Sequence, residues 1–497
     1  MSNQNNIQKW KDRHFGMFIH YGLYSLPAGV WKGEKITYGY SEQILSHAAI
    51  DKNEYDALMN DFTAENFDAR AITSLAKAAG MNYLVITTKH HDGFCLFKTE
   101  TTEYNSFKSA AKRDLVAELA DACQKEGIGL GLYFSWIDWD SPAALSFSDH
   151  NSDTIPEAHQ QLNIAQLTEL LSNYGPICEM WFDMGKPTVD QSRQLADLVR
   201  ELQPEAMING RIWNNQDDFI VLADNEIPEF SMNRPWQTPA SIYHETWGYR
   251  EWQLRENLDD KIREQIRNLA TISALGGNHL LNIGPMGDGS IVPFEDEVLR
   301  GIGSWINVNR EAVFDVEPGF WENEYWGYST LKGNSIYLQI HSIPESGKIE
   351  LKNLKTAPLS ASLLSNNKEL TIIEEEGNFS LVLKGLDKSD HLPVIKLDFS
   401  RTPELDLSHH ISAGQKLKTE GRKDWSYQGE DYYSYKPCIE SQSWTVVPDA
   451  DGQLRIDMTC LAGQKIEISL KGSEDQNGKI QGVDEELFIN AALRVES

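Results

Sequence analysis

Polar side chains with acid–base or hydrogen-bonding capacity recur at the carboxyl ends of the apolar runs of this sequence. Each could simply be where a run meets solvent, but the pattern repeats in six runs. A sugar ring has an apolar C–H face and a rim of hydroxyls, so aromatic rings mixed with charged groups suit a carbohydrate site. The positions are His20; His90, His91 and Asp92; Tyr133 and Trp136; Trp181 and Asp183; Asn209 and Arg211; and Glu245, Trp247 and Tyr249.

Asp183 is the carboxylate with the most informative surroundings. It follows the apolar run CEMWF, so its side chain is expected to emerge at the rim of a site from apolar surroundings. Cleavage of a glycosidic bond needs two such groups, one ionised as nucleophile or base and one protonated as acid. The alternative for Asp183 is a cap on the following helix, and for Trp181, Trp136 and Trp247 it is core packing.

The adjacent pair His90–His91 raises the question of a metal site. Neighbouring residues on a strand point to opposite faces, so the pair is not expected to hold one ion as H-x-H could. Further His/Asp pairs at ligand spacing are missing from the sequence. Hydrogen bonding to sugar hydroxyls by at least one of the two is therefore favoured over a catalytic metal.

The elements that must position these residues alternate along residues 1–315. Near-continuous apolar runs are typical of strands covered on both faces, and amphipathic helical patterns separate them. We interpret as strands residues 15–22, 83–93, 128–136, 177–185, 206–210, 241–249 and 278–285, with 219–224 as an eighth candidate. Such alternation predicts an α/β fold with parallel strands. A closed (β/α)8-like barrel is favoured over an open doubly wound sheet, because no GxGxxG follows the first strand.

The hydrophobic pattern of the sequence changes after residue 315. Short alternating segments separated by turn residues are typical of a β-sandwich, predicted here for residues 316–400. A second set, including SWTVV, QLRIDMT and QKIEISLKG, predicts a further small β module over residues 401–497.

Composition narrows the classes of partner. With 45 Lys+Arg against 74 Asp+Glu the net charge is −29, which disfavours nucleic acid and anionic membranes as partners. Five scattered cysteines are more typical of reduced thiols than of a disulfide framework. The polar amino-terminal segment has no apolar signal-peptide core, so we expect a cytoplasmic protein.

Several long motifs resemble one known family. WKDRHFGMFIHYGLYSLPAGVW, AAGMNYLVITTKHHDGFCLF, MWFDMG, TWGY and LLNIGPMGDGSI, in this order over about residues 8–315, are similar to the α-L-fucosidase family of retaining glycoside hydrolases. The resemblance implies a (β/α)8-like barrel followed by a β-sandwich, no cofactor and a fucosylated oligosaccharide as substrate. It also implies double displacement through a covalent fucosyl-enzyme.

The resemblance assigns roles residue by residue. The WFDG-type segment places the nucleophile at Asp183, with Met184 where the family has Gly. The acid/base is expected in DDFIVLADNEIPEF, where Glu226 is the choice and Glu229 the alternative, with Glu245 behind both. DNEIPE is similar to the branch acting on α1,3/4-linked fucose. The substrate-binding positions implied are His20, Glu42, His90, His91, Tyr133, Trp181, Arg211 and Trp247.

Two other functions compete with hydrolysis of α-L-fucosides. A catalytically silent fucose-binding protein could keep the same fold, although the intact Asp183 and histidines argue against it. A metal-dependent barrel hydrolase is the third interpretation, and loss of activity with a chelator would distinguish it.

Overall fold

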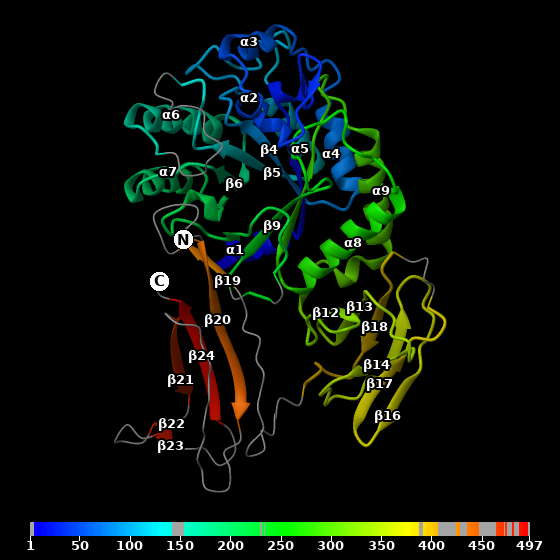
Figure 1. The fold of residues 1–497 in the computed structure, drawn as a ribbon. Helices are drawn as coiled ribbons and strands as arrows, with labels where there is room; N and C mark the ends of the chain where they lie inside the picture. Colours follow the sequence, from blue (N-terminus) through cyan, green and yellow to red (C-terminus); the bar gives the residue numbers. More distant parts are fainter. Residues whose placement is uncertain are drawn as a thin grey trace. The chain divides into compact units, whose positions relative to one another are not determined.

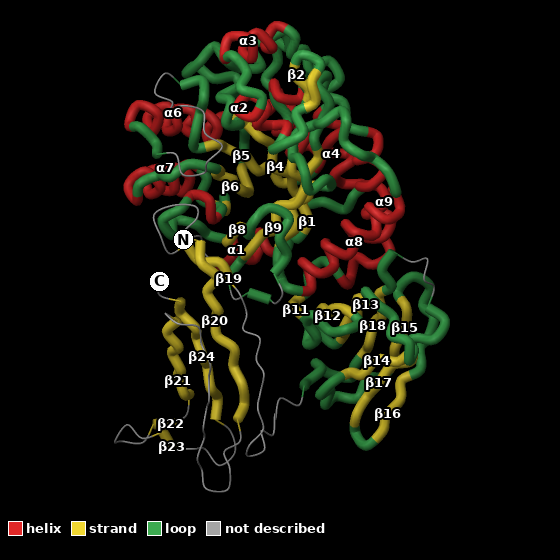
Figure 2. Tube along the Cα trace, viewed as in Figure 1, coloured by secondary structure: helices red, strands yellow, loops and turns green. Residues whose placement is uncertain are grey.

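The structure of the protein, a computed structural model, describes residues 4–141, 154–228, 231–232, 234–386 and 391–405, and the backbone of strands between 424 and 495. The chain divides into two compact units, one made chiefly of residues 1–227 and 234–316 and the other of residues 317–428 and 435–497. Figure 1 traces their elements and Figure 2 colours the same trace by secondary structure.

Among the described residues of the first unit, eight parallel strands form one sheet in the order β7–β6–β5–β4–β1–β10–β9–β8. They are β1 Phe15–Ile19, β4 Tyr83–Lys89, β5 Gly129–Ser135, β6 Ile177–Asp183, β7 Met207–Ile208, β8 Ile220–Val221, β9 Trp236–Ser241 and β10 Asn278–Ile283. Every residue of β1, β4 and β10 is buried, which explains their continuous apolar character.

The sheet closes on itself where β7 meets β8. Asn209 forms a parallel bridge with Phe219, and the amide of Asp218 donates to the carbonyl of Ile208 at 2.8 Å. In return, the Asp218 carboxylate accepts from the amide of Ile208 at 3.0 Å. The closed (β/α)8-like barrel is thereby confirmed over the open sheet, with the 219–224 segment supplying its eighth strand.

Helices surround this barrel in Figure 1. The longer ones are α4 Ala69–Ala78, α5 Leu115–Glu126, α6 Glu157–Asn173, α7 Val189–Leu202, α8 Leu258–Ala274 and α9 Pro293–Asn309. Their limits follow from local chemistry. Asp68 and Asp114 accept from the first amides of α4 and α5, a capping box at Thr188 begins α7, and Gly127, at φ 69°, ends α5.

The first unit also contains shorter elements. They are α1 Gln4–Lys11, α2 Ile44–His47, α3 Lys52–Asp56, the hairpin of β2 Val30–Trp31 and β3 Glu34–Lys35, and the 3-10 turns Leu23–Ser25, Ser41–Gln43, Ala57–Asn60, Gly210–Ile212 and Arg310–Ala312.

The prediction of a strand at residues 241–249 is wrong. The seventh strand along the chain is β9, which ends at Ser241, and the following residues form a turn that carries Trp247. The sequence of β9, WQTPAS, contains three polar residues and a proline, so it lacks the apolar signal used to find strands. It is nevertheless buried at every residue.

The second unit contains antiparallel sheets. One has the order β11–β12–β13–β18–β15 and another β14–β17–β16. Their strands are β11 Glu317–Pro318, β12 Gly327–Lys332, β13 Ser335–Ile340, β14 Lys348–Leu351, β15 Ser360–Leu363, β16 Ile372–Glu375, β17 Asn378–Val382 and β18 Val394–Asp398. Residues of both sheets, such as Leu338 and Leu381, share one apolar core with Trp321 and Trp326, which confirms the β-sandwich.

Beyond residue 405 only strand backbones are described. A sheet of order β19–β20–β24–β21 joins Asp424–Tyr427, Tyr435–Val446, Leu487–Val495 and Gln464–Lys471, and β22 Ser473–Glu474 pairs with β23 Ile480–Gln481. SWTVV and QKIEISLKG fall largely on β20 and β21, while QLRIDMT lies outside the described residues. Separate folding of residues 401–497 stays a prediction.

Within the described residues, no helix combines the length and the apolar composition needed to cross a bilayer.

Candidate active site

A cavity of about 140 Å³ lies at the carboxyl ends of the barrel strands. This is the end at which parallel barrels assemble their active sites. The nine predicted residues Asp183, His20, Glu42, His90, His91, Tyr133, Trp181, Arg211 and Trp247 all line it, together with Phe18, Tyr40, Gln43, Met184 and Asp224.

Asp183, the last residue of β6, is held by two side chains. Tyr133, on the neighbouring strand β5, donates its hydroxyl to Oδ2 at 2.8 Å. Arg211, in the turn after β7, donates from Nη1 to Oδ1 at 2.8 Å. The side chain of Asp183 is 14% exposed and lines the cavity.

The electrostatic balance keeps Asp183 ionised. Burial alone would raise the pKa of this carboxyl, but the charge of Arg211 and the hydrogen bonds from Arg211 and Tyr133 outweigh it and hold the pKa below its ordinary value. An ionised carboxylate with low exposure has the properties that a nucleophile requires.

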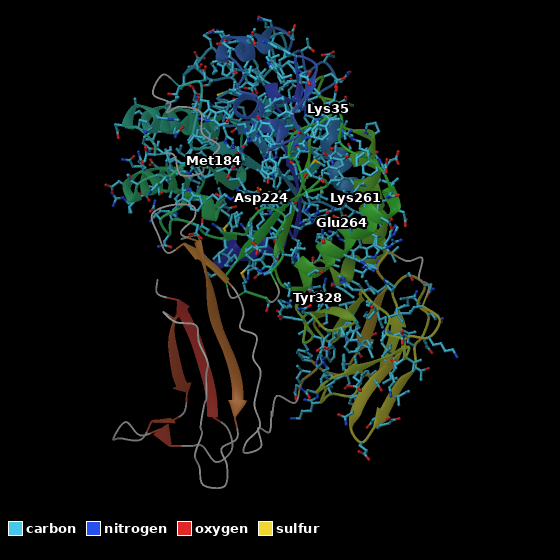
Figure 3. The ribbon with its side chains drawn as sticks, in the orientation of Figure 1. Lys35, Met184, Asp224, Lys261, Glu264 and Tyr328 are labelled. Carbon is cyan, nitrogen blue, oxygen red and sulfur yellow. The ribbon has the colours of Figure 1, made fainter. Side chains whose placement is uncertain are left out.

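Arg211 connects Asp183 to a second carboxylate. Its Nη2 lies 2.6 Å from Oδ1 of Asp224, whose side chain is 28% exposed. Asp224 comes from the turn after β8 and Met184 from the turn after β6, and both are labelled in Figure 3. Trp136 fixes the backbone of Arg211 by donating its indole N–H to the arginine carbonyl at 3.1 Å.

His20 presents a defined tautomer. Asn282 donates its amide to the carbonyl of Trp247 at 2.7 Å, so its Oδ1, 2.7 Å from His20 Nδ1, is the acceptor of that pair. Burial lowers the pKa of His20 to about 3, which keeps the ring neutral. The remaining nitrogen, Nε2, is therefore a hydrogen-bond acceptor.

His90 and His91 do not point to opposite faces, which corrects the expectation drawn from strand alternation. Strand β4 ends at Lys89, so the pair belongs to the following turn, and their ring centroids are 3.8 Å apart. His91 contacts the hydroxyl of Ser135 at 2.8 Å. Burial lowers the pKa of His91 to about 4 and that of His90 well below its ordinary value. In the described part of the chain, no three His, Cys, Asp or Glu side chains form a group suited to a metal ion.

Aromatic rings form the wall around Asp183. Trp181 stacks on Tyr133 with centroids 5.8 Å apart, and the guanidinium of Arg211 lies 5.0 Å from the Trp181 ring centroid. Trp247 lies 5.3 Å from His20. These rings continue into the apolar core of the barrel, so Trp181 and Trp247 are both core and cavity residues.

Glu42 is buried beneath the Trp247 turn. Its Oε2 accepts from the amides of Trp247 at 3.2 Å and Gly248 at 2.8 Å. Burial raises the pKa of Glu42 to about 7 in spite of these bonds. Glu42 therefore anchors the turn that carries Trp247 while also lining the cavity.

The acid/base candidates chosen from sequence occupy other positions. Glu226 is not among the described residues that line the cavity; its Oε2 accepts from the amide of Ala223 at 3.3 Å. Glu229 lies outside the described residues. Glu245 is exposed and accepts from Gln253 at 3.3 Å.

Sequence reasoning missed Asp224 although the available rule could have found it. Asp224 follows a short apolar run, FIVLA, at the carboxyl end of a strand, as the selected residues do. Tyr40 and Gln43 were also missed; they come from a loop without regular periodicity.

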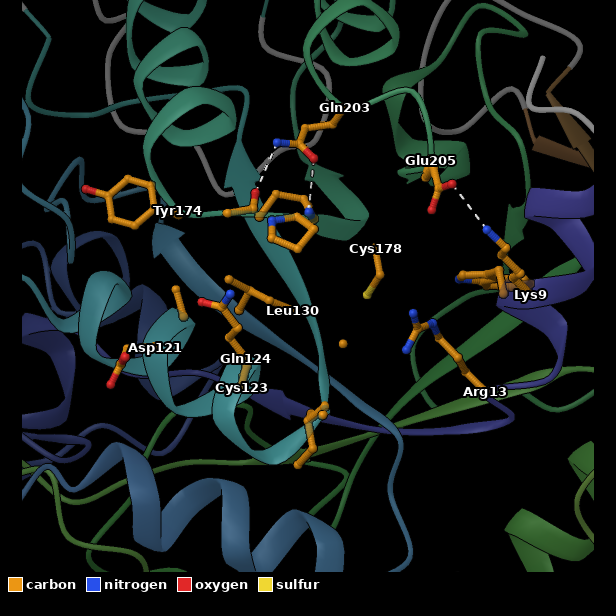
Figure 4. Close-up of a pocket in the computed structure, with 18 of the residues that line it drawn as sticks. Lys9, Arg13, Asp121, Cys123, Gln124, Leu130, Tyr174, Cys178, Gln203 and Glu205 are labelled. Carbon is orange, nitrogen blue, oxygen red and sulfur yellow. Dashed lines mark hydrogen bonds and ion pairs between the residues drawn. The ribbon is translucent and has the colours of Figure 1, made fainter.

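A larger cavity, of about 570 Å³, lies at the opposite end of the barrel, where strands β5 and β6 begin. Figure 4 shows its lining, which includes Arg13, Cys178 and the ion pair between Lys9 and Glu205 at 3.2 Å. This cavity is larger, but the paired carboxylates and neutral histidines lie in the smaller one, which we take as the active site.

Comparison with known proteins identifies the family of this chain. The α-L-fucosidase family model matches residues 1–311. The tissue α-L-fucosidase of Bos taurus is 30% identical over 397 residues, which are 73% of this chain and 81% of that protein. The α-L-fucosidase from Vibrio sp. strain EJY3 gives a TM-score of 0.76 at 28% identity, covering 95% of this chain and 83% of its own.

A Bacteroides thetaiotaomicron α-L-fucosidase, trapped as a covalent intermediate with 2-fluoro-fucosyl fluoride in a Glu→Gln variant, gives a TM-score of 0.72 at 27% identity. It covers 80% of this chain and 96% of its own. The family match spans the barrel and every predicted residue of the cavity, and the chain therefore belongs to the α-L-fucosidase family.

Proposed function

We propose that this protein hydrolyses terminal α-L-fucosides of oligosaccharides or glycoconjugates with retention, through a covalent fucosyl-enzyme on Asp183. The observation that carries the proposal is an ionised carboxylate, held by Tyr133 and Arg211, at the wall of a small cavity. The cavity volume of about 140 Å³ is below the roughly 300–1,000 Å³ of sites for drug-sized ligands, which favours one terminal sugar residue over a longer saccharide. The covalent intermediate of the Bacteroides thetaiotaomicron relative supports the same chemistry.

In the first step, a carboxylate oxygen of Asp183 bonds to the anomeric carbon of fucose. The bond from that carbon to the aglycone oxygen breaks, and the acid residue transfers its proton to the departing oxygen. In the second step, a water oxygen attacks the anomeric carbon while the same residue, now a base, takes a water proton. The ester bond breaks, Asp183 is regenerated, and two inversions give net retention.

The histidines supply the polar contacts to the sugar. Nε2 of neutral His20 accepts a hydrogen bond from a fucose hydroxyl, as does the buried Nδ1 of His90, which has no hydrogen-bond partner within the described residues. A buried polar atom without a partner carries a free-energy cost that a substrate hydroxyl would remove. Trp247 and Trp181 face the apolar side of the ring.

Asp224 is the acid/base that the geometry supports. Of the described residues that line the cavity, Asp183, Glu42 and Asp224 carry carboxyl groups, and Glu42 is engaged by two backbone amides. Asp183 and Asp224 accept from the two terminal nitrogens of one guanidinium, which favours the short separation of about 5–5.5 Å used by retaining enzymes.

Glu226 remains the alternative acid/base, on the family resemblance of its segment. It lies two residues beyond Asp224 in a loop whose continuation at Glu229 is outside the described residues, and a change in that loop would be needed to bring it to the cavity. We also propose a preference for α1,3/4-linked fucose, supported by the DNEIPE segment alone.

Fucose release from three substrates tests the function. The substrates are an aryl fucoside, an α1,2-fucosylated oligosaccharide and a branched α1,3/4-fucosylated one. Release from the branched sugar with no release from the α1,2 sugar supports both reaction and linkage, whereas turnover of the α1,2 sugar overturns the linkage. Absence of release from all three overturns hydrolysis, and fucose binding would then identify a silent binder.

Azide rescue assigns the acid/base. On an aryl fucoside with a good leaving group, Asp224→Gly should lose its second step and recover turnover with azide, giving fucosyl azide. Glu226→Gly is the matched variant from the same loop and should retain wild-type turnover. Rescue of Glu226→Gly instead would move the role to Glu226.

A further inference from the structure

A line of buried hydrogen bonds crosses the barrel interior beneath the cavity. The indole of Trp10, on α1, donates to Oε2 of Glu179 at 2.6 Å. The amide Nε2 of Gln237, on β9, donates to Oε1 of Glu179 at 2.9 Å. The indole of Trp181 then donates to Oε1 of Gln237 at 2.8 Å. All four side chains are buried.

The neighbours of Gln237 fix the orientation of its amide. An ionised Glu179 can only accept, so it requires the NH2 group, which also contacts the Tyr83 hydroxyl at 3.0 Å. The indole N–H of Trp181 can only donate, so it requires the carbonyl oxygen. With the amide reversed, a donor would face a donor at Trp181 and an acceptor would face an acceptor at Glu179.

Trp181 connects the Gln237 amide to the active site. Its ring stacks on Tyr133 at 5.8 Å and lies beneath the guanidinium of Arg211 at 5.0 Å. Tyr133 and Arg211 are the two side chains that hold Asp183. A rotation of the indole would therefore displace both contacts of the nucleophile together.

We propose that Gln237 and Glu179 are positioning residues that set the orientation of Trp181 and, through it, of the two groups that hold Asp183. The inference rests on the proposed function, because its consequence for the sugar depends on Asp183 as nucleophile. Neither residue lines the cavity, so both act from beneath it.

The charge of Glu179 determines which groups donate and which accept in this line of hydrogen bonds. Burial raises its pKa to about 7, against the hydrogen bonds of Trp10 and Gln237 and the charge of Arg13. The other titratable groups that face it are Tyr83, on β4, and Cys178, beside it on β6. Below this pKa the protonated carboxyl becomes a donor and competes for the Gln237 carbonyl, which withdraws the acceptor from Trp181.

A double-mutant cycle tests the connection. Gln237→Met removes the hydrogen bonds at similar volume, and Trp181→Phe removes the indole N–H but keeps an aromatic ring. We expect Gln237→Met to lower kcat on an aryl fucoside by roughly tenfold with KM within about threefold, because small displacements of reacting groups mainly affect the chemical step. In the Trp181→Phe background the same change should cost less than about twofold.

Gln265→Met is the matched control, since Gln265 is a buried glutamine of the same unit, on α8, that does not line the cavity; it should leave kcat unchanged. An equal loss in both backgrounds, or wild-type kcat in Gln237→Met, overturns the inference. If Gln237→Met fails to fold, as thermal unfolding would show, Glu179→Gln replaces it in the cycle. The dissociation constant for L-fucose, measured in the same variants, shows the effect of each substitution on the site even if the protein does not turn over fucosides. Failure of the proposed function can therefore be distinguished from failure of this inference.

Glu179→Gln provides the pH readout. It keeps the shape of the side chain but cannot ionise, so it should resemble the wild type with Glu179 protonated. The ratio of wild-type to variant kcat/KM should be largest above pH 7 and decline as pH falls below 7. A ratio that does not change with pH would mean that Glu179 has a structural role only.

Discussion

The guanidinium of Arg211 donates to Oδ1 of Asp183 at 2.8 Å while its face covers the ring of Trp181. One side chain thus sets the charge state of Asp183, the proposed nucleophile, and itself packs against the Trp181 ring. Because the pair is largely shielded from water, its electrostatic contribution is larger than that of an exposed ion pair.

Arg211→Met should lower kcat/KM by at least about 100-fold, the cost of removing a preorganised charge or donor from an active site. The pKa of Asp183 should rise when the cation is lost. Asp183 acts when ionised, and its activity disappears as pH falls through its pKa, so the acid limb of the kcat/KM profile should move to higher pH. Arg193→Met, which removes an exposed pair with Asp190 on α7, should leave the profile unchanged; an unmoved acid limb in Arg211→Met would contradict the assignment.

Tyr133→Phe should lower kcat by roughly tenfold or more, because a hydrogen bond to a charged group contributes about 1.5–3 kcal/mol. The stacked ring is retained, so KM and thermal stability should change little. Tyr55→Phe is the matched control, since the Tyr55 hydroxyl donates to another buried carboxylate, Asp92, at 2.8 Å. Equal losses of kcat in the two variants would show that the Asp183 contact is not special.

Glu295→Gln should alter the pH dependence of stability. Burial raises the pKa of Glu295, on α9, from 4.5 to about 8. Between these values the native state binds more protons than the unfolded state, so the wild-type free energy of unfolding falls as pH rises from about 5 to 8. The variant lacks this decrease, so the difference in free energy of unfolding between variant and wild type should rise by about 1 kcal/mol or more between about pH 5 and pH 8. Urea titrations at these two pH values would measure the change.

Glu297→Gln, an exposed substitution on the same helix, should follow the wild type at both pH values. If the difference in free energy of unfolding between Glu295→Gln and wild type were the same at both pH values, Glu295 would be ionised in the folded protein.

Gly303→Ala should destabilise the barrel unit by about 1–3 kcal/mol through overpacking. Gly303 lies where α9 crosses α4, and an added Cβ would overlap the carbonyl oxygen of Ala78. Ser304→Ala, at the exposed neighbouring position, should change the denaturant midpoint little. Equal midpoints for the two variants would show that the helices can separate without cost.

The elements that could be predicted from the sequence are those whose burial requires runs of apolar residues. Strands such as Tyr83–Lys89 are buried at every residue. Strand β9 was missed because its polar residues are buried: Gln237 takes part in the hydrogen-bonded line beneath Trp181 and leaves no apolar signal.

The predicted cavity residues that lie at strand ends come together because parallel strands share one carboxyl edge. The proposed acid/base, Asp224, also follows a strand end, but the choice between Asp224 and Glu226 depends on the geometry of the turn that carries both. Asn225 has φ 61°, donates its amide to Pro239 and accepts from the amide of Ser241 at 2.8 Å. This turn places Asp224 at the cavity and Glu226 against Ala223, a distinction that residue spacing does not contain.

The closure of the barrel has a further consequence for its active site. Strands β7 and β8 contain two residues each, so few backbone hydrogen bonds join them. Asp183 belongs to the β6 side of this join and Asp224 to the β8 side, and the Arg211 guanidinium ties one to the other. Arg211 therefore does more than hold Asp183: it also joins the two sides of the barrel where the two shortest strands of the sheet meet, so its loss should affect the closure of the barrel as well as the active site.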